Sequence, residues 1–464
     1  MKATIKYFTA ILLTVFIFQS CQDIDDVAAP IHIEIQDFIW KGMNKYYLWQ
    51  ADVPNLADDR FASQAQLNLF LRTYDVPEDL FDALRVDPSI DRFSWIVNDY
   101  VTLEQSFQGT SKNNGIDFGL SYKPGSSTEI FGWVRYIIPN SDASTKNIKR
   151  GDFFYGVNGT QLTLDNYQSL LYGANENYTL NMADYDGTSL VSNGTSVTVT
   201  KTVLNENPIF INKVIDKGAH KIGYLMYNGF YSDYDTDLNN AFGSLKTQGI
   251  TDLVLDLRYN GGGSVLTATR LASMITGQFT GDLFAKLNYN SKLSANNTNY
   301  LFTNKIGSAG LNSLNLTTVY VLTTKSTASA SELIINGLHP YINAVQIGDY
   351  TYGKNVASRT LYDSPDFSAN KRNPNHRYAM QPIIANVINS VGFGDYTSGL
   401  TPTYELKEYL STLGVLGEET EPLLSTAIGK ITGTAKMVKE NKGVKFKYLT
   451  DSKTIFGQNE MHIE

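Results

Sequence analysis

The chain has 464 residues and a formal net charge of −8, with 42% hydrophobic and 18% charged residues. This length is enough for about three domains, and the composition is ordinary for a globular protein. The negative charge and the lack of a basic patch in the sequence argue against a nucleic-acid partner. No His/Cys/Glu cluster has metal-ligand spacing, so we expect neither a metal nor a cofactor.

The first 21 residues have the pattern of a lipoprotein signal peptide. Lys2 and Lys6 precede an apolar stretch over residues 8–18, which is too short for a convincing transmembrane helix. Cys21, the only cysteine, follows this stretch directly after a Ser, as in a bacterial lipobox. We expect lipidation at Cys21 and a place in the envelope of a Gram-negative bacterium, anchored to the outer membrane and facing the periplasm or the cell surface. Plain secretion with cleavage nearby is the alternative.

Residues 22–105 are predicted to form a tether and a small helical domain. Apolar residues recur at helical spacing from Ile35 to Met43, and two further helical stretches follow near residues 65–73 and 77–84. No residue pattern in this part indicates chemistry, so we assign it a packing role.

Residues 106–204 are predicted to form a β-rich domain. In residues 149–159 a Gly-Asp turn, a strand and an Asn-Gly turn fit together as part of a hairpin. This arrangement resembles a PDZ domain of the circularly permuted bacterial kind, in which an exposed strand edge binds an extended peptide. The resemblance implies a peptide-carboxylate loop near residues 115–120. The residues expected to bind the peptide are Phe118, Gly119 and Leu120. A β-rich domain without a ligand is the alternative.

Residues 205–434 alternate between strand and helix patterns, which indicates a mostly parallel sheet with crossover helices. A strand expected over residues 252–257 runs into a turn that ends in three glycines, 261–263. This turn lacks the Lys-Ser/Thr of a P-loop and the spacing of a dinucleotide site. Its glycines either supply only positive φ angles or present backbone N–H groups to an oxyanion. Residues 435–464 are predicted to be a polar C-terminal tail.

A small, hydroxyl-rich turn at residues 327–332 (Thr-Ala-Ser-Ala-Ser-Glu) separates a buried strand from the start of a helix. Backbone N–H groups at a helix start are unpaired and favour negative charge, which suits a nucleophile. The plain alternative is an N-cap in which Ser329 and Glu332 form a capping box. The helix and a returning strand bring Lys354 to the same sheet end as Ser329, as a Ser–Lys dyad requires.

Three motifs thus follow one another: Asp-Leu-Arg-Tyr-Asn-Gly-Gly-Gly at 256–263, the turn at 327–332, and Gly353 with Lys354. Together they resemble the C-terminal processing peptidases, also called tail-specific proteases. The resemblance implies Ser329 as the nucleophile and Lys354 as the general base. It implies a multidomain α+β protein: a helical N-terminal domain, a PDZ-like β-rich domain and a crotonase-like α/β catalytic core. The implied backbone donors to the oxyanion are Ala330, Gly262 and Gly263.

Two positions depart from the family pattern. Ser358 stands where many members place a Gln that orients the Lys amine, and Gly261 replaces the more usual Pro. The sequence favours a membrane-anchored serine endopeptidase that cleaves protein substrates, aided by recognition of their C-termini. Ser358 keeps open a catalytically weak or inactive peptide-binding lipoprotein of the cell envelope. A structural envelope lipoprotein without a peptide ligand is the third possibility.

A lysine base must be largely desolvated, because a free lysine has a pKa of about 10.4 and is charged at neutral pH. Tyr350 and Tyr352 precede Lys354, and no acidic residue is nearer to it in the sequence than Asp349. We therefore expect apolar surroundings without a carboxylate at Lys354.

Overall fold

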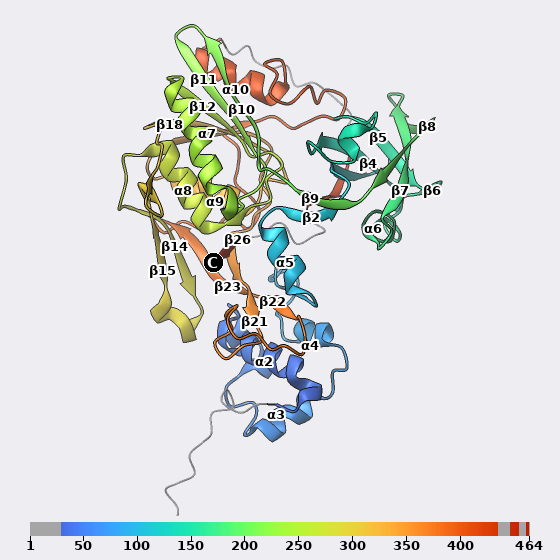
Figure 1. The fold of residues 1–464 in the computed structure, drawn as a ribbon, viewed down its shortest axis with the longest axis vertical. Coiled ribbons are helices and arrows are strands. Elements are labelled where there is room, and N and C mark those ends of the chain that lie inside the picture. The colour runs from blue at the N-terminus through green and yellow to red at the C-terminus, as the bar shows by residue number, and fades with distance from the viewer. Residues whose placement is uncertain (1–28, 435–445, 454–460, 464) are drawn as a thin grey trace, which may run out of the picture.

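The computed structural model describes residues 29–434, 446–453 and 461–463. It is a mixed helix-and-sheet protein of several parts, with N-terminal helices at the bottom of Figure 1, a β-rich unit at the right and a larger core at the upper left. The prediction for Cys21 lies outside the described residues. Within the described ranges, no helix combines the length and apolar character that a membrane span requires.

The N-terminal part forms the helices that its apolar spacing predicts. On α2 (Glu34–Tyr46), Ile39 and Met43 are fully buried on the face turned to the core. A short strand, β1 (Trp95–Val97), attaches this part to the core by pairing with β22 (Ala379–Gln381). The other elements here are α3 (Gln64–Leu71), α4 (Pro77–Ala83), α5 (Tyr100–Phe107) and β21 (Leu361–Tyr362), which pairs with β22.

The core is organised around a six-stranded sheet in the order β10-β11-β12-β18-β19-β24. All neighbours are parallel except β10 and β11, which confirms the predicted crossover pattern. The strands are β10 (Ile209–Lys217), β11 (His220–Tyr227), β12 (Asp252–Asp256), β18 (Thr318–Thr323), β19 (Asn343–Gly348) and β24 (Tyr404–Glu405).

Helices cover both faces of this sheet, which is why its central strands are continuous apolar runs. Leu253 and Leu255 share a core with α7, α8 and α9, whereas Val254 shares another with α10. The helices are α7 (Asp235–Thr247), α8 (Val265–Thr276), α9 (Ala330–Leu338) and α10 (Pro422–Thr432).

A second six-stranded sheet has the order β13-β26-β20-β23-β14-β15. Its strand β26 (Met461–Ile463) lies between β13 and β20 and is parallel to both. Met461 is fully buried, which gives this short strand an apolar anchor. The other strands are β13 (Gly263–Ser264), β20 (Val356–Arg359), β23 (Ile383–Asn389), β14 (Leu283–Tyr289) and β15 (Thr298–Leu301). A small hairpin, β16 (Lys305–Ile306) with β17 (Ala309–Gly310), stands apart.

The β-rich unit is a sheet in the order β25-β3-β4-β5-β7-β8, with β6 on β5 and helix α6 (Tyr167–Tyr172) beside it. A short ribbon, β2 (Thr110–Asn113) with β9 (Thr202–Asn205), leads to the core. The strands of the sheet are β3 (Ile116–Tyr122), β4 (Ile130–Ile137), β5 (Phe153–Val157), β6 (Thr160–Gln161), β7 (Asn177–Tyr185), β8 (Leu190–Thr200) and β25 (Tyr448–Asp451).

Two predictions about this region need correction. Residues 116–120 belong to β3 and do not form a loop, because Ile116, Phe118 and Leu120 alternate into the core of the unit. The segment expected to be a polar tail contributes two strands among its described residues, β25 and β26. These strands pair with partners far away in the sequence, so no local pattern indicated them.

Candidate active site

Ser329 sits between β18 and α9 in a strained conformation. Its φ of 65° and ψ of −117° lie in a region that residues other than glycine rarely occupy. The side chain is fully buried, yet its Oγ has no hydrogen-bond partner within the described residues. A strained, buried hydroxyl without a partner is costly, and such features gather at functional sites.

Asn260 holds the Ser329 turn against the glycine turn. Its carbonyl oxygen accepts the N–H of Ala328 and the hydroxyl of Ser331, each at 3.1 Å. Its side-chain amide donates to the carbonyl of Tyr227 at 2.8 Å, which anchors the turn to β11. Two motifs about seventy positions apart in the sequence, at Asn260 and Ser331, are therefore in direct contact.

The three predicted oxyanion donors differ in their surroundings. The N–H of Gly262 donates to Asn260 Oδ1 at 2.9 Å, so this donor is engaged. Gly263 has a φ of 136°, and a Cβ at this position would lie 2.4 Å from the carbonyl oxygen of Phe230, so only glycine fits. Ala330 is the first residue of α9, where a backbone N–H has no acceptor within the helix.

Glu332 connects the Ser329 turn to the Lys354 turn. Its Oε2 accepts the backbone N–H of Ser329 at 2.7 Å and that of Lys354 at 2.9 Å. Its Oε1 accepts the N–H of Gly353 at 2.7 Å and the hydroxyl of Thr351 at 2.5 Å. The carboxylate expected only as part of a helix cap thus fixes the backbones of both predicted catalytic residues.

Burial raises the pKa of Glu332 to about 7, although the four donors around it oppose this shift. The expectation that no carboxylate lies nearer to Lys354 than Asp349 holds along the sequence but is wrong in space. Glu332 is 22 positions away and is nevertheless hydrogen-bonded to the backbone of Lys354.

The N-terminal part supplies two contacts to the Lys354 turn that sequence analysis missed. The Nζ of Lys354, a fully buried residue, lies 5.0 Å from the ring centroid of Phe93. Arg92 donates to the carbonyl of Gly353 at 2.6 Å. Arg92 and Phe93 also line a cavity of about 430 Å³ that reaches Asn355 and Val356. The N-terminal part therefore does more than pack, although neither residue stands in a recognisable motif.

Strand β26 brings His462 into the same region. His462 is in register with Ser358 on β20 and with Ser264 on β13. Its ring stacks on Phe107 at 4.3 Å, and burial together with the charge of Lys354 lowers its pKa to about 4. Ser358, the predicted orienting residue, is buried and donates to the carbonyl of Met461 at 3.4 Å. No sequence signal marked His462, because its pairing is entirely nonlocal.

Arg258, from the first motif, stabilises the base of the site. Its guanidinium donates to both carboxylate oxygens of Glu421, at 2.6 and 2.9 Å, and its Nε donates to Asp256 at 2.9 Å. The guanidinium is fully buried, so these paired contacts are needed to offset its desolvation. Within the described ranges, no group of three or more His, Cys, Asp or Glu residues could hold a metal ion.

Comparison with known families is consistent with this geometry. Residues 221–371 match the model of peptidase family S41, and residues 34–95 match that of the peptidase S41 N-terminal domain. These matches support assignment of the chain to the C-terminal processing peptidase family. The match of residues 221–371 to peptidase family S41 supports a serine peptidase as the class of protein.

Two curated relatives match parts of the chain. A carboxyl-terminal-processing protease of Picosynechococcus sp. is 29% identical over 171 residues, which are 37% of this chain and 38% of that protein. The chloroplastic C-terminal processing peptidase of Tetradesmus obliquus is 28% identical over 267 residues, 55% of this chain and 54% of that one. The chain thus spans roughly half or less of the length of these relatives.

Solved structures cover more of the chain. A Bacteroides fragilis NCTC 9343 protein assigned to the S41 proteases has a TM-score of 0.67 and 29% identity, and the match covers 86% of this chain and 98% of that one. The photosystem II D1 C-terminal processing protease has a TM-score of 0.52 and 19% identity, with 85% and 100% covered. The second likeness shows the fold alone.

Proposed function

We propose that the protein is a serine endopeptidase that cleaves protein substrates, with Ser329 as nucleophile and Lys354 as general base. The observation that carries this proposal is the link through Glu332, which binds the backbone of both residues with one carboxylate. The strained turn and the free Oγ of Ser329 support the nucleophile role independently.

In this proposal the neutral amine of Lys354 takes the proton of the Ser329 hydroxyl while Oγ attacks the substrate carbonyl carbon. The N–H of Ala330, at the positive end of α9, stabilises the oxyanion that forms, and Gly263 lies on the neighbouring turn. The protonated amine then gives its proton to the leaving amine. Water hydrolyses the acyl-enzyme by the same route in reverse.

We further propose that the β-rich unit binds extended peptides as a PDZ domain does, and that lipid on Cys21 anchors the protein to the outer membrane. The first part is supported by strand β3, whose outer side pairs only with the four-residue strand β25 among the described residues, and by the adjacent helix α6. The second part is supported by the sequence pattern around Cys21. Substrates would then be proteins that reach the periplasmic or outer face of the envelope.

A second candidate is a peptide-binding lipoprotein that cleaves weakly or not at all. It is favoured by Ser358, which stands in place of an orienting Gln and donates to a backbone carbonyl of β26. The complete burial of Ser329 points the same way, because a substrate must open the site before it can react.

The test is cleavage of an unfolded protein substrate by the wild type, Ser329→Ala and Ser331→Ala. We expect Ser329→Ala to lose activity by several orders of magnitude, because a nucleophile and its base act as a unit. Ser331→Ala removes a hydroxyl from the same turn and should be much milder, since it loses one hydrogen bond, worth about 1 kcal/mol.

Thermal unfolding of each variant shows whether its fold survives. Cleavage by purified Ser329→Ala would refute the nucleophile assignment. A folded wild type that neither cleaves nor reacts with a covalent probe for activated serine would favour the second candidate.

A further inference from the structure

The chain's own segment β25 occupies the strand edge at which peptide binding is expected. Asp451 pairs with Gly119 of β3 in antiparallel register, and the N–H of Ser452 donates to the carbonyl of Phe118 at 2.9 Å. On its other side β3 pairs with β4, so without β25 the strand β3 would be the edge of the sheet. An unpaired edge of this kind binds extended peptides through main-chain hydrogen bonds.

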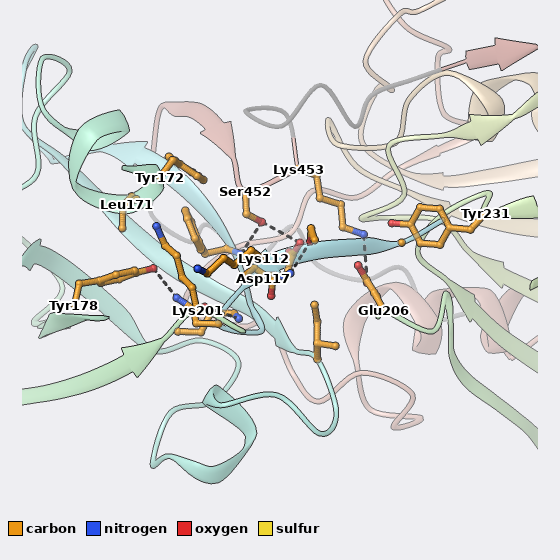
Figure 2. Close-up of a pocket in the computed structure, with 17 residues that line it drawn as sticks. Lys112, Asp117, Leu171, Tyr172, Tyr178, Lys201, Glu206, Tyr231, Ser452 and Lys453 are labelled. Atoms are coloured by element: carbon orange, nitrogen blue, oxygen red, sulfur yellow. Dashed lines mark hydrogen bonds and ion pairs between the residues drawn. The ribbon is translucent and has the colours of Figure 1, made fainter. Parts of the chain in front are cut away.

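The segment runs on along a groove between β3 and α6. Figure 2 shows Ser452 and Lys453 in this groove, with Leu171 and Tyr172 of α6 on one side and Glu206 towards the other end. A cavity of about 60 Å³ remains beside them. Ser452 donates from its hydroxyl to Asp117 at 3.0 Å, which fixes the chain direction.

Two charged residues of the segment are buried against opposite charges. Asp451 Oδ2 lies 3.0 Å from Nη1 of Arg135 on β4. Lys453 donates to the carbonyl of Asn228 at 2.8 Å, and its Nζ lies 3.5 Å from Glu206. Arg135 also pairs with Asp117 of β3, so Asp451 is its second carboxylate partner. Because a buried charge is costly unless it is paired, a segment seated beside Arg135 and Glu206 is favoured when it has an acidic residue followed two positions later by a basic one.

Most other contacts of the segment are ones that another polypeptide could replace. The pairing with β3 uses main-chain groups, and Tyr448, Leu449 and Thr450 are only partly covered. The segment also touches the nucleophile turn, because Asp451 accepts the hydroxyl of Ser326 at 2.6 Å, three residues before Ser329.

We propose that the groove between β3 and α6 is a docking site for extended polypeptides with the pattern Asp-x-Lys, and that residues 448–453 are its resident occupant, which a second polypeptide displaces. This inference deepens the proposed function by naming the class of segment that the peptide-binding unit takes and what holds its place. It rests on the proposed peptide-binding role of that unit.

The test uses the full chain with Ser329→Ala throughout, so that no probe is cleaved. The probe is a fluorescent peptide with the sequence of residues 446–453, and its binding is followed by anisotropy. In the chain with the unaltered segment, residues 448–453 compete with the probe for the groove at an effective concentration in the millimolar range. Asp451→Asn with Lys453→Gln removes both charges from the occupant but leaves the groove intact. We expect this variant to bind the probe at least tenfold more tightly.

Two controls make the result specific. A probe with Asn and Gln at the same two positions should lose the gain, since it no longer matches Arg135 and Glu206. Asp216→Asn, an exposed change in the β10–β11 hairpin, should leave probe binding at the level of the wild-type segment. A folded double variant that does not bind the probe would overturn the proposal.

Hydrogen exchange on the chain with an unaltered segment decides the matter if the double variant fails to fold. A displaceable occupant opens locally, so the amides of β25 should exchange at least a hundredfold faster than those of the central strand β12. Equal protection of β25 and β12 would mean a permanent strand and would overturn the proposal. Neither measurement depends on cleavage, so loss of the proposed catalytic function would leave both results interpretable.

Discussion

The carboxylate of Glu332 accepts the backbone N–H of Lys354 at 2.9 Å. The same oxygen accepts the N–H of Ser329, so one side chain sets the separation of the two turns that carry the proposed dyad. All four groups that bind this carboxylate are donors, which requires the ionised form as acceptor. Positioning of the site therefore depends on the charge state of one buried residue.

Glu332→Gln should impair catalysis while preserving side-chain volume. An amide carries only one acceptor oxygen, so its NH₂ group would face backbone donors. A buried donor left without an acceptor costs about 1–3 kcal/mol, which corresponds to a loss of about five- to 150-fold in kcat if the whole cost falls on the positioning of the two turns. Glu418→Gln, at an exposed site, is the matched control. Unchanged kcat in folded Glu332→Gln would contradict the positioning role.

Activity should rise with pH through a midpoint between about 6.5 and 8.5, because only the neutral amine of Lys354 can accept a proton. Lys354→Ala and Lys354→Arg should both be nearly inactive, since a guanidinium stays protonated. Metal chelators should have no effect. A flat profile from about pH 5 to 9, or an active Lys354→Arg, would show that another group takes the proton of Ser329.

The raised pKa of Glu332, about 7, falls in the same pH range. As pH falls through this value the carboxyl takes up a proton and loses acceptor capacity, so it would also lower activity on the acid side. The pH profile of Glu332→Gln separates the two groups. The rise should persist in this variant if Lys354 causes it and should vanish if Glu332 does.

Gly353→Ala should disturb the Lys354 turn. Gly353 has a φ of 93°, and an added Cβ would lie 2.2 Å from the carbonyl oxygen of Thr397. Gly125→Ala is the matched control, because its φ of 77° carries a similar backbone cost while nothing lies within 4 Å of the new Cβ. We expect the control to lose about 1 kcal/mol in urea unfolding. Gly353→Ala should lose clearly more stability than Gly125→Ala and most of the peptidase activity. Equal losses of stability in the two variants would contradict this account.

His462 should make the protein less stable in acid. Its folded-state pKa of about 4 lies below the ordinary value of 6.5, so the unfolded chain binds a proton that the folded chain excludes. The resulting contribution of His462 to the free energy of unfolding is about 3 kcal/mol. It is fully present above about pH 6.5 and is lost as the pH falls towards 4. Glu332 has the opposite sign, because a raised pKa gives a contribution that is lost as pH rises through about 7.

Urea unfolding of the wild type and His462→Gln at pH 7, 5 and 4 isolates the histidine, since Glu332 is common to both. Relative to the wild type, the free energy of unfolding of His462→Gln should rise by about 3 kcal/mol when the pH is lowered from 7 to 4. Parallel stability curves would show that His462 titrates normally.

Cys21→Ser should release the protein from membranes or block its maturation, if Cys21 carries lipid. Fractionation of cells that express each form, followed by mass analysis of the mature N-terminus, measures this. A soluble wild type whose N-terminus lies well beyond Cys21 would rule out lipidation.

Local patterns in the sequence were enough to predict most elements of the core. The apolar run before Thr327 predicted β18, and the helical spacing after Ala330 predicted α9. The apolar residues before Arg258 predicted β12. The motif residues could be named because their chemistry is tied to short turns at element ends. In each case the signal lies within a few residues of the position that it predicts.

The tertiary structure alone decided which distant groups surround that site. Glu332 bridges two turns, Phe93 faces Lys354, and His462 arrives on a three-residue strand. Likewise, β25 pairs with β3 through main-chain groups that every residue carries, so its four residues hold no periodic signal. Contacts of this kind depend on how the chain closes long loops and buries apolar surface as a whole, and no short window of sequence contains that information.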